Sequence, residues 1–359
     1  MLTGFDESGT DLVGRAAAAI DHGRPEVCME LLASRDTAAL PDRLRLRRLW
    51  AVAALRRAQV VEARGELQLL IDEALSAERP VAVTDARAVL AHLQHVSGNT
   101  ADACVDLIGA MNLASELMAD GHTGHDMATC LNTIGYCWLH MGGPEPAITY
   151  FRQARDHAPD AGRLMVMVRL NALEARVQTM RRSWRERRPI PSESIDAAAD
   201  LVRELTADDH TMAPRFRIEV RTFEAIVRLL TGDLDAALLG FERAAADLEL
   251  VTDDKAVAGL HLWWATALRL GGEPEAALEH GAVALRHSHQ PQGRAQANLE
   301  LALACKQLGR FEQACEAFEA ADREADTSPG APLAAAIEKL TSQTAGASGP
   351  IPVDPVVGT

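Results

Sequence analysis

Six glycines, each at the centre of one spaced set of small and bulky residues, constrain this chain more than any other feature. They are Gly23, Gly98, Gly142, Gly232, Gly272 and Gly309. Seven residues before each lies Ala or Gly, and five residues after each lies Ala, or Cys28 in the first set. Twelve residues after, five of the six sets have Ala, and Arg35 is the exception. Self-similarity at fixed offsets is the signature of a repeat array.

Each glycine can be interpreted as the stop between two helices. An amphipathic stretch precedes it, with apolar residues at helical spacing, as in Leu131, Ile134, Trp138 and Met141. Glycine adopts the left-handed cap conformation without strain, so it ends this helix. A second helix then begins, with Pro25, Pro144 or Pro274 in its first turn in three of the sets. Each unit is therefore a helix-turn-helix that stacks on its neighbours to bury its second face.

The pattern resembles the tetratricopeptide repeat (TPR) family. Residues 131–159 match the family's signature positions at Leu131, Ile134, Gly135, Trp138, Ala147, Phe151, Ala154 and Pro159. A seventh unit lacks the glycine but keeps Ala51, Ala58, Ala63 and Leu67. The resemblance covers residues 9–325 and implies an all-α, right-handed superhelical solenoid of about eight helix-turn-helix units. Adjacent glycines lie 37 to 44 residues apart, more than the family's usual 34, so we expect a more irregular superhelix.

We expect three regions along the chain. Residues 1–8 are predicted to be a flexible N-terminus, residues 9–340 the helical array, and residues 341–359 a disordered Gly/Pro-rich tail. Between Gly142 and Gly232 the sequence predicts helices over 163–181 and 194–206. An inserted Arg-rich loop over 182–193 separates them, because Pro189 and Pro191 forbid a continuous helix.

Composition and motifs argue against several classes of function. The net charge of −15 disfavours a broad nucleic-acid surface. No secretory signal or membrane-length apolar run is visible, and unpaired cysteines in apolar stretches suggest a reduced, cytoplasmic protein. Arginine outnumbers lysine 33 to 3, which favours a GC-rich bacterial genome. No GxxxxGK[ST], GxGxxG, GxSxG or HExxH motif occurs, so we predict no enzyme and no cofactor.

Two groups of metal-ligating residue types have simpler explanations. Asp120, His122, His125 and Asp126 fit a solvated loop between helices. His280, His287 and His289 could converge at one helix end, but surface histidines at a helix terminus explain them equally well. We therefore predict no metal site.

The resemblance implies that the first helix of each unit lines a concave groove for peptides or partner helices. Carrying the groove positions over unit by unit selects a set of polar, aromatic and cationic residues: Arg45, Arg48, His92, His95, Asn132, Tyr136, His140, Asn171, Trp263, Arg269, Gln296 and Lys306. Such a surface suits an extended chain with acidic or carboxylate groups. The alternative is that these are ordinary solvated helix residues.

An arginine cluster forms a second candidate site. Arg181, Arg182, Arg185, Arg187 and Arg188 surround Trp184, and together they could hold an acidic partner. The simpler interpretation is a solvated loop whose arginines pair with nearby glutamates.

The sequence predicts a protein- or peptide-binding adaptor or regulator that uses its concave groove. The alternative is the regulatory or sensory arm of a bacterial signalling protein, of the diguanylate cyclase or transcriptional regulator type, whose output domain lies outside these residues. A homo-oligomeric scaffold is a third interpretation. No membrane or nucleic acid is expected as a partner.

Overall fold

The chain folds into helices that pair in sequence order. The computed structural model describes residues 12–33, 40–157, 162–207 and 212–326. Within these ranges there are sixteen α-helices, paired into eight helix-turn-helix units, and one short 3-10 helix, η3 (Leu248–Leu250). This confirms the predicted all-α repeat architecture. The expected N-terminus 1–8, the end of the array beyond residue 326 and the tail 341–359 lie outside the described residues.

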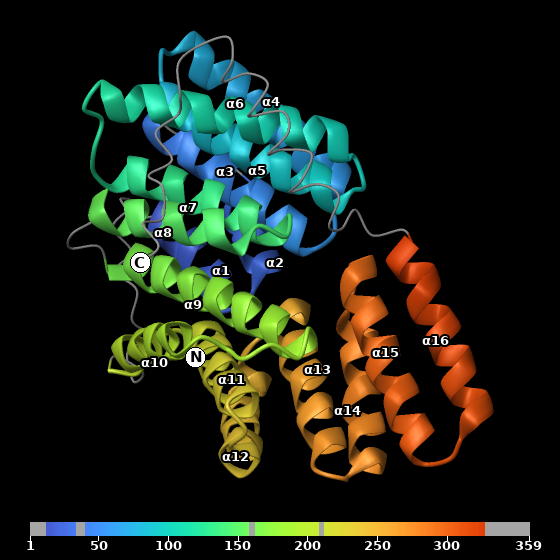
Figure 1. The fold of residues 1–359 in the computed structure, drawn as a ribbon. Helices are drawn as coiled ribbons and strands as arrows, with labels where there is room; N and C mark the ends of the chain where they lie inside the picture. The colour runs from blue at the N-terminus through green and yellow to red at the C-terminus, as the bar shows by residue number, and fades with distance from the viewer. Residues whose placement is uncertain (1–11, 34–39, 158–161, 208–211, 327–359) are drawn as a thin grey trace.

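The helices form two layers (Figure 1). The first helices of the units pack against one another in order: α1 (Leu12–Asp21), α3 (Leu40–Arg56), α5 (Pro80–Val96), α7 (His125–His140), α9 (Gly162–Arg185), α11 (Pro214–Leu230), α13 (Asp254–Leu270) and α15 (Pro291–Gln307). Each second helix packs between its own first helix and the next one: α2 (Pro25–Leu31), α4 (Val60–Ser76), α6 (Thr100–Ala119), α8 (Pro144–His157), α10 (Ser192–Thr206), α12 (Leu234–Ala245), α14 (Pro274–His287) and, last in the array, α16 (Phe311–Asp326). None of the described helices combines the length and apolar composition that a membrane crossing requires.

The six glycines act as the predicted helix stops. All six have φ between 67° and 89°. At Gly98, the glycine N–H donates to the His95 carbonyl and the Asn99 N–H donates to the Gln94 carbonyl, at 3.0 and 2.9 Å. This pair of bonds closes the helix end. In the two units without the glycine, Ala58 and Arg187 adopt the same conformation, with φ of 57° and 54°.

Small residues on the first helices allow the close packing that the repeat pattern predicts. A Cβ placed on Gly135 would lie 2.6 Å from the Phe151 ring and 3.2 Å from the Ala147 carbonyl oxygen. Phe151 is 1% exposed and packs in the largest helical core with Trp138. Residue size at position 135 therefore sets how near α7 and α8 approach each other.

The Arg-rich loop is shorter than predicted. Helix α9 continues through Arg185, and only residues 186–191 separate it from α10, so the expected loop 182–193 is wrong at both ends. The added turn of α9 places Trp184 partly buried against the core, and this packing stabilises the added turn. Pro189 and Pro191 then prevent the helix from continuing, as expected.

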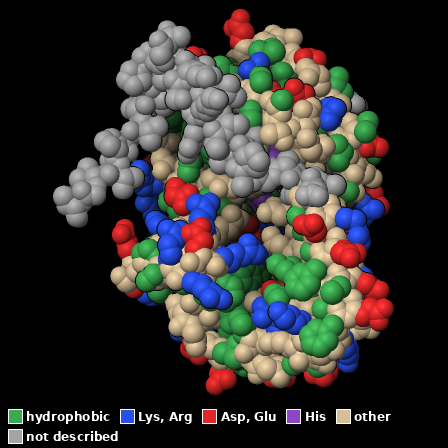
Figure 2. Space-filling model, turned by 45° about the vertical axis from the view of Figure 1, so that its right-hand side comes forward, with side chains coloured by type: hydrophobic (Ala, Val, Ile, Leu, Met, Phe, Trp, Pro, Cys, Tyr) green, Lys and Arg blue, Asp and Glu red, His purple; other side chains and the backbone are tan. Residues whose placement is uncertain are grey.

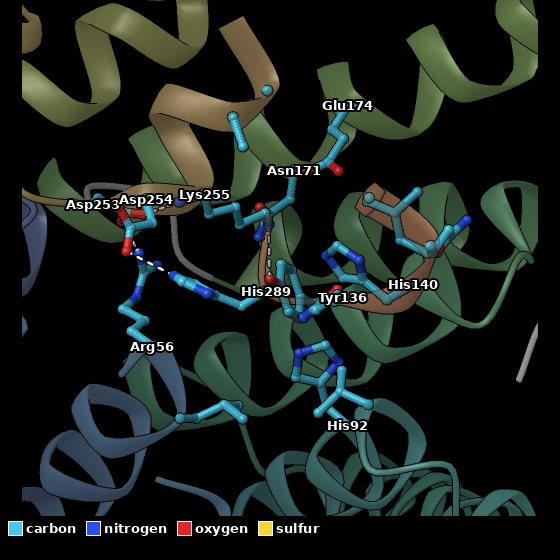
Figure 3. Close-up of a pocket in the computed structure, with 18 of the residues that line it drawn as sticks. Arg56, His92, Tyr136, His140, Asn171, Glu174, Asp253, Asp254, Lys255 and His289 are labelled. Atoms are coloured by element: carbon cyan, nitrogen blue, oxygen red, sulfur yellow. Dashed lines mark hydrogen bonds and ion pairs between the residues drawn. The ribbon is translucent and has the colours of Figure 1, made fainter. Parts of the chain in front are cut away.

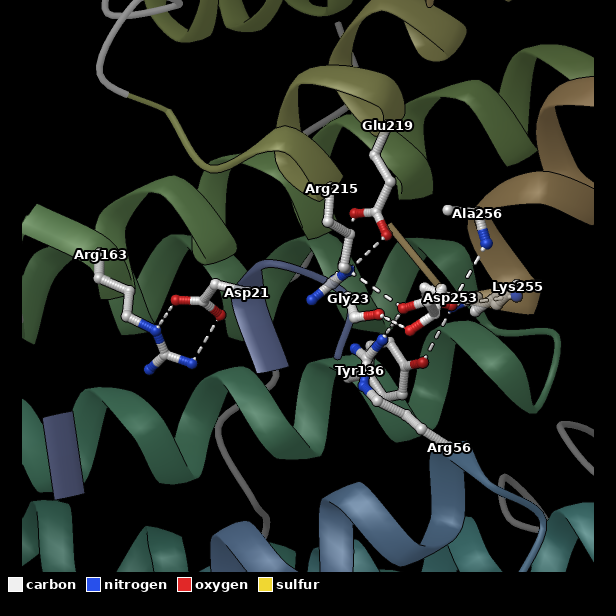
Figure 4. Close-up of polar contacts among 11 residues, drawn as sticks. Asp21, Gly23, Arg56, Tyr136, Arg163, Arg215, Glu219, Asp253, Lys255 and Ala256 are labelled. Atoms are coloured by element: carbon white, nitrogen blue, oxygen red, sulfur yellow. Dashed lines mark hydrogen bonds and ion pairs between the residues drawn. The ribbon is translucent and has the colours of Figure 1, made fainter. Parts of the chain in front are cut away.

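The array curls until its first unit touches the segment before α13. We call this the closing contact and define it by Gly23, Arg56, Thr252 and Asp253. Gly23, Arg56 and Asp253 are labelled in Figure 4. The Thr252 N–H and hydroxyl both donate to the Gly23 carbonyl, at 3.0 and 2.6 Å, and Arg56 pairs with Asp253. Gly23 suits this place because an added Cβ would lie 3.0 Å from the Val251 Cβ. The contact joins residues about two hundred positions apart in the sequence.

Candidate functional site

The concave side of the array encloses one large cavity of about 850 Å³. Residues from the first helix of every unit line it, together with residues 287–290 before α15. Figure 2 shows the hollow between the two halves of the molecule, with histidine inside it and Lys and Arg side chains gathered beside it. The expectation that first helices form a concave surface is confirmed.

Most of the predicted groove residues come together in this cavity. Seven of the twelve line it: Arg48, His92, Asn132, Tyr136, His140, Asn171 and Gln296. The other five do not: Arg45, His95, Trp263, Arg269 and Lys306.

Those five side chains are directed elsewhere. Arg45 is exposed and lies 3.4 Å from Asp126, and Lys306 is exposed on α15. Arg269 donates to Glu300 at 2.8 Å. His95 is buried behind the wall, where its Nε2 bonds the His140 carbonyl at 3.1 Å, and Trp263 lies beneath Arg181.

Two asparagine amides meet at the centre of the wall. Asn171 Nδ2 on α9 donates to Asn132 Oδ1 on α7 at 2.9 Å. Asn132 is 4% exposed, so its amide is held in place by the helices around it. The bond leaves the Asn132 N–H groups and the Asn171 oxygen available, a donor and an acceptor side by side. A main-chain amide of a bound peptide presents the complementary pair.

Three rings form an aromatic cluster next to this pair (Figure 3). The centroid of Tyr136 lies 5.0 Å from that of His92 and 4.2 Å from that of His140. Burial, together with the nearby Lys255 charge, lowers the pKa of His92 to about 3 and that of His140 well below its ordinary value. Both imidazoles are therefore neutral near pH 7. His92 Nδ1 and His140 Nε2 have no hydrogen-bond partner among the described residues.

Lys255, which the sequence analysis missed, lies across the cavity from these rings. Its Nζ donates to the Tyr136 hydroxyl at 3.0 Å, and Figure 3 shows it beside Asn171 and Glu174. Burial opposes its charge, but Tyr136 and Glu174 outweigh burial and raise the pKa of Lys255. It is therefore a fixed cation inside the cavity.

Most cations of the cavity wall are already paired with carboxylates. The lining includes eight Arg or Lys and five Asp or Glu residues, in a chain with a net charge of −15. The paired arginines and their partners are Arg48 with Asp85, Arg56 with Asp253, Arg163 with Asp21, Arg182 with Glu145 and Arg215 with Glu219. The structure gives Arg181 and Arg185 no such partner within the described residues.

The arginine cluster divides between the cavity and the outer surface. Arg181, Arg182 and Arg185 line the cavity, whereas Trp184 packs against the core. Arg187 and Arg188 are exposed outside it, and Arg188 pairs with Glu186.

A positional signal could have found further lining residues. In several units, residues two, six or ten positions before the helix cap line the cavity: Asp21, Arg48, Val52, Arg56, His92, Val96, Asn132, Tyr136, His140, Arg181 and Arg185. Arg56 was missed although it lies two residues before Ala58, which stands at the glycine position of the seventh unit. Asp253 and Lys255 follow no such offset, since they lie at the N-terminal end of α13, Asp253 as its N-cap and Lys255 in its first turn.

The histidines near the end of the array contact other side chains. His287 and His289 both contact Asp254, at 2.6 and 2.7 Å, and His280 lies 2.8 Å from His261. Within the described part of the chain, no group of three or more His, Cys, Asp or Glu side chains could hold a metal ion.

Comparison with solved structures gives the fold. The APC/C hetero-tetramer Cut9–Hcn1 has a TM-score of 0.62 at 13% identity; the match covers 94% of this chain, which spans 57% of that one. A Rap protein complexed with Competence and Sporulation Factor has a TM-score of 0.58 at 12% identity and 90% coverage of both chains. A human IFIT1 dimer with m7Gppp-AAAA has a TM-score of 0.50 at 12% identity, covering 84% and 68%.

Comparison with protein-family models and with curated proteins finds no match. The fold therefore rests on the paired helices, the capped turns and the similarity to these structures. The chain is a TPR-like all-helical repeat protein.

Proposed function

We propose that this protein is a non-enzymatic adaptor or regulator whose concave cavity holds an extended peptide segment of a partner protein. The observation that carries the proposal is the Asn132–Asn171 amide pair, which presents a donor and an acceptor to the cavity. Because Asn132 is only 4% exposed, a bound group that completes the hydrogen bonds of the pair is favoured over leaving them unmade.

The size and surroundings of the cavity support the same function. Its volume of about 850 Å³ lies within the range of about 300–1,000 Å³ that is typical of ligand sites. Two structural neighbours are complexes with a partner, Cut9 with Hcn1 and Rap with Competence and Sporulation Factor. The IFIT1 neighbour carries m7Gppp-AAAA, but the net charge of −15 favours a peptide over a nucleic acid here.

A regulatory arm of a bacterial signalling protein is the second candidate. The similarity to Rap over 90% of both chains favours it. In either role the cavity holds the peptide, and a cytoplasmic setting fits the five buried, free cysteines.

Binding of random heptapeptides tests the proposal. The full chain is immobilised, a random heptapeptide library is passed over it, and the retained peptides are identified by mass spectrometry. We expect the wild-type protein to retain a defined subset and the double variant Asn132→Ala/Asn171→Ala to retain it about tenfold more weakly. Replacing both asparagines together leaves neither amide unpaired, so the fold is preserved.

Asn112→Ala supplies the matched control, because Asn112 is exposed on α6, outside the cavity. It is expected to bind as the wild type does. Absence of any retained peptide, or equal retention by the double variant, contradicts the proposal. Preferential binding of a capped oligoadenylate would replace it with nucleic-acid recognition.

A further inference from the structure

The last turns of α9 present three cations to the cavity, of which Arg182 is paired with Glu145. The Arg181 guanidinium carbon lies 4.8 Å from the centre of the Trp263 ring, and its Nη2 donates to Gln296 Oε1 at 3.0 Å. Arg185 lies one turn further along the same helix and also lines the cavity. Aromatic stacking and the Gln296 bond therefore fix the direction in which the Arg181 guanidinium points.

Glu300 is the carboxylate that acts on the positive charge of Arg181 and Arg185, and it does so through space without forming an ion pair with either arginine. Neither arginine has an ion-pair partner in the part of the chain that the structure describes. The nearby acid, Glu300, accepts instead from Arg269 at 2.8 Å. Burial, together with the adjacent Arg185, lowers the pKa of Arg181 to about 9. Arg181 is partly buried and Arg185 is exposed, so an arriving anion gains more at Arg181 than it would on an open surface.

We propose that Arg181 and Arg185, with Gln296, form a subsite for a carboxylate of the bound peptide. The planar guanidinium of Arg181 matches a carboxylate with two parallel hydrogen bonds, and Gln296 Nε2 is a further donor. The inference rests on the proposed peptide-binding function and names the peptide chemistry that this function selects.

The helix also sets the register of such a peptide. Asn171, Glu174, Gln178, Arg181 and Arg185 all line the cavity from α9. From Asn171 to Arg181 the helix rises about 15 Å, which an extended chain spans in about four to five residues. A peptide whose main chain meets the asparagine pair would therefore place an acidic group about four to five residues further along.

Two heptapeptide libraries test the subsite, one with free carboxyl termini and one with amidated termini. We expect the wild type to retain peptides with an acidic side chain or terminus at one end. Arg181→Gln/Arg185→Gln should weaken their retention roughly ten- to hundredfold, the range for a hydrogen-bonded charged group. Arg181→Lys keeps the charge but loses the planar guanidinium. Its retention of acidic peptides should lie between that of the wild type and that of the double variant.

The matched control is Arg187→Gln/Arg188→Gln, which removes two neighbouring cations that lie outside the cavity. Its retention should equal that of the wild type, and circular dichroism should show the same helicity in all variants. If the preference for acidic peptides is lost in the amidated library, the subsite binds the terminal carboxylate. If the preference persists there, the subsite binds an acidic side chain.

The two proposals fail in different ways. If peptides are retained without acidic preference, or equally by the Arg181/Arg185 variant, the carboxylate subsite is wrong and the peptide-binding function stands. If the wild type retains no peptide, the function itself fails and the subsite fails with it.

Discussion

Replacing Asp253 by alanine removes the carboxylate on which the closing contact depends. Asp253 is 5% exposed; Arg56 and the nearly buried Arg215 both pair with it, the latter at 3.5 Å (Figure 4). The same side chain caps α13 by accepting the Lys255 and Ala256 N–H groups at 3.0 and 3.4 Å. Burial opposes its charge, but Arg56 and Arg215 outweigh burial and lower its pKa.

The expected cost follows from these contacts. Breaking a buried ion pair costs about 3–5 kcal/mol, and losing a helix cap costs about 1 kcal/mol. Because Arg215 keeps Glu219 at 3.0 Å as a partner, the ion-pair term lies near its lower bound. We therefore expect Asp253→Ala to lower the free energy of unfolding by about 4 kcal/mol. Asp253→Asn keeps the cap and isolates the ion-pair term.

Urea unfolding followed by circular dichroism measures the loss. Because repeat arrays can unfold in parts, hydrogen exchange of the Thr252 N–H, which bonds Gly23, reports on the closing contact itself. Asp254→Ala is the control. The Asp254 side chain is 43% exposed, and its ion-pair contacts are with His287 and His289. Its replacement should therefore lower the free energy of unfolding by less than about 1 kcal/mol. Equal losses in both variants, or unchanged Thr252 exchange in Asp253→Ala, would refute the reasoning.

Three further predictions concern packing, capping and pH. Gly135→Ala should destabilise the protein by about 1–3 kcal/mol, because the added Cβ clashes with Phe151. Gly65→Ala has open space around the added Cβ and should stabilise helix α4 by up to about 1 kcal/mol. Equal shifts in melting temperature for the two variants would contradict this. Ala58→Gly should stabilise by about 1 kcal/mol, because the left-handed cap strains alanine, and a lower melting temperature would contradict it. The pKa of His92 is lowered to about 3 in the folded chain. Below about pH 6.5 the His92 imidazole is therefore protonated in the unfolded chain but stays neutral in the folded chain. Stability should thus fall between pH 7.5 and 5.5, and His92→Gln should flatten that fall by about 1 kcal/mol in urea titrations; an unchanged slope would contradict it.

The residues that define the fold act locally, which is why the sequence predicted so much of it. A glycine that must take positive φ, as at Gly142, or a small residue where two helices cross, as at Gly135, is recognisable within one unit. The same offsets placed Asn132, Tyr136 and His140 on one face of α7. Arg187 took the cap conformation without being glycine, and the pattern did not reveal that cap. Ala58 also took it, at a position that the pattern aligns with the glycines.

The pairing of charges across the array could not be predicted in this way. Arg56 meets Asp253 nearly two hundred residues away, and Lys255 meets Tyr136 across the cavity. These contacts depend on how far the solenoid curls, which is the sum of small rotations at every unit interface. The extension of α9 through Arg185 also depended on tertiary packing, because Trp184 finds a core to pack against.

The sequence alone therefore determined the repeated unit, its helix stops and the face of each first helix that turns inward, because local sterics and periodicity decide these. The tertiary structure decided which charges are neutralised. It paired five of the cavity's arginines with carboxylates and, among the described residues, left Arg181 and Arg185 without an ion pair. Coulomb interactions depend on distance through space, and distance along the chain gives no measure of it.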